Sequence, residues 1–74
     1  MKVIQVGEIL LNVNNISETT LAYDIEFGSI VEYNVKIQMS NGNVYRRYAP
    51  NGKNTNLIDF FKNKIVTIGE DNEV

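Results

Sequence analysis

The 74-residue sequence contains no cysteine and no histidine. The absence of cysteine excludes disulfide bonds, thiolate metal sites and thiol nucleophiles. The absence of histidine removes the most common general base and the most common ligand of transition metals. An enzyme of this composition would have to use carboxylates, lysines, hydroxyls or tyrosines. We therefore expect no catalytic residue, no metal site and no cofactor, and a protein that is not an enzyme.

Long apolar runs are also missing, since no stretch approaches the roughly 18 apolar residues that a membrane-spanning helix requires. The first 13 residues, MKVIQVGEILLNV, resemble a signal peptide in having one lysine among apolar residues. However, Gln5, Gly7 and Glu8 interrupt the apolar run, and no small-residue cleavage site follows. We expect a cytoplasmic protein that does not bind a membrane.

The sequence does contain enough apolar residues, 43%, for one small core. A chain of this length buries only roughly 60% of the surface that its unfolded state exposes. We expect a single small domain over residues 1–74, with a frayed tail over residues 69–74. Because such a core is near the minimum size, binding to a partner or to a second copy would add needed stability.

Charge is distributed unevenly along the chain. The net charge is −2, but acidic residues dominate positions 1–34 and basic residues dominate positions 35–64. This separation favours a sheet in which strands of opposite charge lie side by side. The alternative is a basic binding face. The abundance of asparagine and isoleucine is typical of AT-rich coding sequences, so we infer a low-GC bacterium, or a phage or plasmid of one, as the source.

Two alternating segments predict a central β-hairpin. In TLAYDIEF (20–27) and VEYNVKIQM (31–39), every second residue is apolar or aromatic. A three-residue loop over residues 28–30 keeps the two apolar faces together and sets Leu21 opposite Ile37.

The Asn-Gly pair at 41–42 predicts a second hairpin with a type I′ turn. This turn sets Met39 opposite Val44. In the strand that follows the turn, it places Arg46 on the apolar face and leaves Arg47 exposed on the other face.

Residues 2–13 predict a further strand whose core-facing residues are Ile9, Leu11 and Val13. Three apolar residues fall out of phase with these: Ile4, Val6 and Leu10. A two-fold contact through this edge strand would bury them, and we therefore expect a homodimer. The alternative is a bulge at Gly7 that turns them inward and leaves a monomer.

A helix is predicted after Pro50, capped by one of residues 54–56 and ending near residue 64. Its apolar stripe consists of Leu57, Ile58, Phe61 and Ile65, with Phe60 on the flank. Residues 65–68 either continue the helix or form an extended segment, which we favour. The predicted fold is α+β, a four-stranded antiparallel β-meander with one C-terminal α-helix packed on one face.

Two functions fit these features. The leading hypothesis is a small non-enzymatic interaction module that binds another protein, such as an accessory or inhibitor protein of a phage or mobile element. The alternative is a single-stranded nucleic-acid-binding protein, in which an aromatic ring stacks on a base and cations meet phosphates. Lys53, in a segment that resembles part of a phosphate loop, could hold an anion at the helix start. The candidate binding residues are Lys36, Gln38, Tyr45, Arg47 and Lys53.

Overall fold

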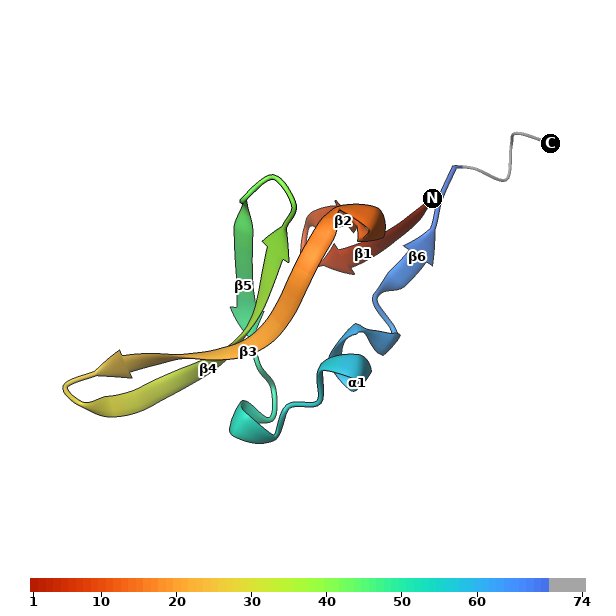
Figure 1. Ribbon diagram of the computed structural model, residues 1–74. Coiled ribbons are helices and arrows are strands. Elements are labelled where there is room, and N and C mark those ends of the chain that lie inside the picture. The colour runs from red at the N-terminus through yellow and green to blue at the C-terminus, as the bar shows by residue number, and fades with distance from the viewer. Residues whose placement is uncertain (70–74) are drawn as a thin grey trace.

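The computed structural model describes residues 1–69, which form two three-stranded antiparallel sheets and one short helix (Figure 1). The larger sheet has the strand order β3-β4-β5, with β3 at Ile16–Glu26, β4 at Ser29–Met39 and β5 at Val44–Tyr48. The smaller sheet has the order β2-β1-β6, with β1 at Lys2–Val6, β2 at Ile9–Asn12 and β6 at Ile65–Thr67. Helix α1 spans Leu57–Lys62, and two 3-10 turns, η1 (Val13–Asn15) and η2 (Gly52–Asn54), complete the elements. The α+β class is confirmed, whereas the single four-stranded meander is wrong.

The N-terminal segment forms a hairpin and not the single strand that its sequence pattern predicts. The chain reverses in a two-residue turn in which Gly7 adopts a φ of 63°. Strands β1 and β2 then pair with Val6 opposite Ile9 and Ile4 opposite Leu11. Because residues directly opposite each other share a face, the turn places Ile4, Val6, Ile9 and Leu11 on one face of the hairpin.

This turn corrects the expectation that Ile4, Val6 and Leu10 lie outside the core. Ile4 and Val6 are only 6% and 3% exposed, whereas Leu10 is 55% exposed. Gly7 belongs to the turn itself and is not a bulge within a strand. Two of the three side chains that motivated a contact through the first strand are therefore buried within one chain. Self-association as such stays a prediction.

The core lies between the two sheets. Val35 and Ile37, at the centre of β4, have no exposed surface. Leu57, Phe60 and Phe61 of α1 pack against this cluster and are partly buried. The fully buried members of the cluster are Ile4, Val6, Leu11, Val35, Ile37, Met39 and Ala49.

The hairpin between β4 and β5 has a longer loop than the predicted type I′ turn. Gly42 has a φ of 95°, but Asn41 does not have a positive φ. The Gly42 amide donates to the Met39 carbonyl (3.0 Å), and the Met39 amide donates to the Asn43 carbonyl (2.8 Å). This is the pattern of a three-residue loop with a glycine bulge.

The extra loop residue shifts β5 by one position and exchanges its faces. Tyr45 lies opposite Ile37. Arg47 lies opposite Val35, so both side chains are half-buried on the core face. Arg46 is exposed on the outer face. The predicted faces of β5 are therefore wrong, because a one-residue slip moves every side chain of a strand to the other face.

The β3–β4 hairpin closes with a two-residue turn, not with the predicted loop over residues 28–30. Glu26 pairs with Ser29, and Phe27 and Gly28 form the turn between them. Both turn residues have positive φ, 50° and 81°, as a type I′ turn requires.

The register of this hairpin also differs from the prediction. Val31 has no partner on β3 and forms a bulge, and Leu21 lies opposite Val35 where the prediction sets it opposite Ile37. For residues 21–24 this shift amounts to two residues, so these side chains keep their predicted faces, whereas beyond the bulge Ile25 is shifted by three residues.

Helix α1 is shorter than predicted. Asn56 is the N-cap, since its side-chain oxygen accepts a hydrogen bond from the Asp59 amide (3.0 Å). The rings of Phe60 and Phe61 meet edge to face, with centroids 5.0 Å apart. Ile58 was predicted in the apolar stripe but is 80% exposed, because its side chain lies about 100° around the helix from Leu57.

The chain returns to the smaller sheet after the helix. Strand β6 pairs with β1, with Ile65 opposite Ile4, which confirms the expected extended segment. At the end of this pair, the Ile68 amide donates to the Met1 carbonyl (2.9 Å). Of the predicted frayed tail, residues 70–74 lie outside the described part of the chain.

Candidate protein-binding arm

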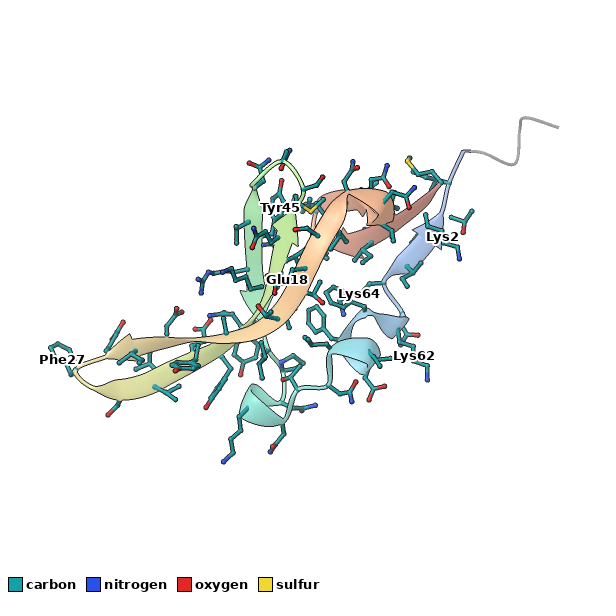
Figure 2. The ribbon with its side chains drawn as sticks, viewed as in Figure 1. Lys2, Glu18, Phe27, Tyr45, Lys62 and Lys64 are labelled. Carbon is teal, nitrogen blue, oxygen red and sulfur yellow. The ribbon has the colours of Figure 1, made fainter. Side chains whose placement is uncertain are left out.

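The residues predicted to form a binding face do not lie together. Lys36 and Gln38 are on the outer face of β4, whereas Tyr45 and Arg47 are on the core face of β5. The Arg47 guanidinium is also engaged locally, since Nη1 donates to the carbonyl of its neighbour in the chain (2.7 Å). Lys53 is exposed in η2, outside the sheet. Figure 2, which labels Tyr45, shows its position on the upper hairpin.

The segment before α1 is an ordinary turn and cap. The amides of Asn54 and Thr55 donate to the carbonyls of Asn51 and Gly52, each at 3.1 Å. The Asn51 amide donates to Oγ1 of Thr55 (3.0 Å). These amides are therefore satisfied within the chain and are not free to hold an anion beside Lys53.

The outer end of the β3–β4 hairpin projects from the body of the molecule (Figure 1). Strand β5 pairs with β4 only at residues 34–38, so within residues 1–69 no third strand covers residues 23–33. We call residues 23–33 the arm. The molecule measures 56 × 24 × 18 Å, with a radius of gyration of 14.3 Å. A compact domain of this length would have a radius of gyration of about 11 Å.

The apolar stripe of the core continues along the arm without cover. Tyr23 lies opposite Tyr33, with ring centroids 5.9 Å apart, and Ile25 lies opposite Ile30. These residues share a face with buried Val35, yet Tyr23, Ile25 and Ile30 are 52%, 57% and 46% exposed. Contiguous exposed apolar surface is a feature of many interaction sites, so the stripe is a candidate site.

Phe27 occupies the tip of the arm (Figure 2). Its side chain is fully exposed, and its backbone has a φ of 50°. A bulky residue rarely adopts positive φ, and the conformation costs on the order of 1–3 kcal/mol. Because the ring is not buried within the chain, no internal packing offsets this cost. The strain and the exposure together make the tip of the arm a candidate contact point.

The arm is acidic. It contains Asp24, Glu26 and Glu32 and no basic residue. Asp24 lies directly opposite Glu32, which is unfavourable for two like charges. Asp24 is compensated by the Arg46 guanidinium (3.5 Å) and by the Asn34 amide (3.0 Å), whereas Glu26 and Glu32 form no ion pair with any of residues 1–69. The Asp24–Arg46 pair is of the kind expected from strands of opposite charge in one sheet.

The sequence pattern did not predict the arm. Alternation predicts which face of a strand is apolar, but not how far other segments pack on that face. The relative lengths of the strands carry a usable signal. Strands β3 and β4 have 11 residues each, whereas β5 has 5 and stops before Pro50. A short third strand cannot cover the whole of a long hairpin.

Comparisons with protein-family models, curated proteins and solved structures gave no match. No helix in residues 1–69 is long and apolar enough to cross a membrane. The same part of the chain contains no group of three or more acidic side chains placed to hold a metal ion. The candidate site therefore rests on the geometry of the arm.

Proposed function

We propose that the protein is a small non-enzymatic interaction module that binds another protein through the arm. The observation that carries this proposal is Phe27, an aromatic residue held at positive φ and fully exposed at the tip. The arm combines this ring with an apolar stripe and a charge of −3. Its complement is an apolar surface bordered by basic residues.

The backbone of the arm supports the same function. Strand β3 is an edge strand over its whole length, and β4 has a free edge over residues 29–32, beyond the hydrogen bond that the Tyr33 carbonyl accepts from the Ala49 amide. Free edges present unpaired N–H and C=O groups to which a partner strand can add. A two-stranded ribbon is also only marginally stable in water, so a partner that covers it would stabilise it, although part of the binding free energy is spent on ordering the ribbon.

The role of an accessory or inhibitor protein of a phage or mobile element stays a prediction, as does the cytoplasmic location. Binding to single-stranded nucleic acid also stays a prediction. No observation of the fold favours it, because the register of β5 separates Tyr45 and Arg47 from Lys36 and Gln38.

A photoreactive residue tests the proposal. We expect p-benzoylphenylalanine at position 27, expressed in cells of the source organism, to give a discrete crosslinked product with a second protein chain. The matched control carries the same residue at position 41, in the exposed loop of the other hairpin. Equal labelling from both positions, or no product from position 27, contradicts the proposal.

A further inference from the structure

A hollow of about 460 Å³ lies beside α1, where the helix passes the start of β3 and the chain turns toward β6. Ile58 and Ile65 in its wall are 80% and 50% exposed, so the hollow presents apolar side chains to solvent. Its volume is within the range of roughly 300–1,000 Å³ that is usual for binding pockets. It is lined by Thr19, Leu57, Ile58, Phe61, Lys62 and Ile65.

We infer that this hollow receives Phe27 and the neighbouring arm residues of a second copy of the chain. The inference rests on the proposed function for the role of the arm and adds the identity of a partner. One contact would then bury both the exposed ring of Phe27 and the exposed apolar wall of the hollow.

The charges of the two surfaces are complementary. The arm carries three carboxylates, and the charged side chain in the wall of the hollow is Lys62. Lys64 is engaged within the chain, since Nζ donates to the Phe60 carbonyl (2.8 Å) and lies 4.1 Å from that ring. Lys62, by contrast, forms no ion pair within residues 1–69, and neither does Glu26 next to the tip. Docking would place these unpaired charges near each other.

The contact has to be made between copies. The arm points away from α1, and Phe27 and Lys62 lie at opposite ends of the view in Figure 2. Every copy has both an arm and a hollow, so two antiparallel copies can each insert an arm into the other. Such a reciprocal exchange closes as a two-fold dimer, with the same contact made twice.

Sedimentation over a concentration series tests the dimer. We expect the wild type to change from the 8.4 kDa chain mass to twice that mass as concentration rises. Phe27→Asn removes the ring and suits the turn, and Ile58→Asp adds charge to the hollow at an exposed position. Each variant should weaken dimerisation at least tenfold while its circular dichroism spectrum and melting temperature show an intact fold.

Mixing the two variants gives a test that loss of folding cannot imitate. The Phe27→Asn chain keeps its hollow and the Ile58→Asp chain keeps its arm, so a mixed dimer retains one of the two contacts. We expect the mixture to associate more strongly than either variant alone. Leu10→Asp, at an exposed position of β2, is the matched control and should leave the dimer unchanged.

Several results would overturn the inference. These are a wild type that stays monomeric at millimolar concentration, a dimer that persists in Phe27→Asn, dissociation by Leu10→Asp alone, and open oligomers larger than dimers. A monomer that still crosslinks to a different protein from position 27 would overturn self-association and leave the proposed function standing. A monomer without any crosslink would overturn both.

Discussion

Phe27 and Gly42 both adopt positive φ, but only at Phe27 does this conformation cost free energy. Glycine has no Cβ and reaches this conformation without steric cost. For Phe27 the cost is real, and full exposure means that the ring recovers none of it within the chain. Strain at the tip of the arm therefore lowers the free energy of unfolding of the isolated molecule, and no contact within the chain offsets it.

The first prediction follows from this cost. Replacing Phe27 by Asn, which favours the first position of a type I′ turn, should raise the free energy of unfolding by about 1 kcal/mol. Urea denaturation, at a concentration where sedimentation gives the mass of a single chain, measures the change. Phe27→Val is the matched control, because it removes the same ring but resists positive φ, and it should not stabilise the fold. Lower stability of the Asn variant would contradict the prediction.

The second prediction concerns Gly42. Gly42→Val should destabilise the fold by about 1 kcal/mol or more, because a β-branched residue is poorly accommodated at a φ of 95°. Thermal unfolding measures the loss. Ser40→Val changes an exposed residue of the same loop that lacks positive φ, and it should have a much smaller effect. Equal melting temperatures for the two variants would show that the glycine conformation is not required.

At the scale of the element, the short helix α1 is stabilised by packing along one face. Leu57, Phe60 and Phe61 pack on the core, and Asn56 caps the first turn. A helix of this length is unstable in isolation, so its packing has to stabilise it.

The third prediction compares two neighbouring faces of this helix. Phe61→Ala should cost about 2 kcal/mol, less than the roughly 3–5 kcal/mol of a fully buried phenylalanine, because Phe61 is only half-buried. Ile58→Ala should leave the stability of the monomer almost unchanged, since Ile58 is 80% exposed. Chemical denaturation of both variants gives the comparison. A larger loss for Ile58→Ala would mean that the face of α1 that carries Ile58 is packed.

Alternation predicted β3 and β4 well, because side-chain period and face are local properties of a strand. Register was harder, since it depends on the length of the turn. A loop one residue longer than expected at Gly42 reversed the faces of β5, and with them the candidate binding face around Tyr45 and Arg47. The alternation of apolar residues also breaks between Val6 and Ile9. The cause is again a turn, formed by Gly7 and Glu8.

The candidate site was less predictable than the elements. Nothing in the alternation of Tyr23 and Ile25 distinguishes a covered strand from an uncovered one. Cover depends on which other segments reach the strand, and that is a property of the tertiary fold. The positive φ of Phe27 also follows from closing the hairpin one residue earlier than the sequence pattern favours.

At the scale of the whole molecule, stability is expected to differ between the core and the arm. Residues 35–39 of β4 lie between two strands and under the smaller sheet, whereas most of the arm is an exposed two-stranded ribbon in which only Tyr33 packs against the core. Local opening requires less free energy where few apolar contacts are broken.

The fourth prediction is a gradient of amide hydrogen exchange. The arm amides should exchange much faster than those of residues 35–39, because opening the arm leaves the core intact. Mass spectrometry of peptides from both regions measures the difference. Raising the protein concentration should slow exchange in the arm and around Ile58 if copies dock there, while the loop at Gly42 provides an unaffected reference. Equal protection of arm and core at low concentration would contradict the gradient.

The position of β1 at the centre of the smaller sheet has a consequence for synthesis on the ribosome. β1 and β2 can pair as soon as they emerge, but the other edge of β1 waits for β6. Pairing Ile4 with Ile65 closes a loop of about 60 residues, and contacts so distant in sequence form late. Until then, the emerging chain displays an apolar strand with unpaired backbone groups, which is a template for aggregation. The open edge of β1 is thus where the nascent protein is most vulnerable to misassembly until residues 65–67 have been made.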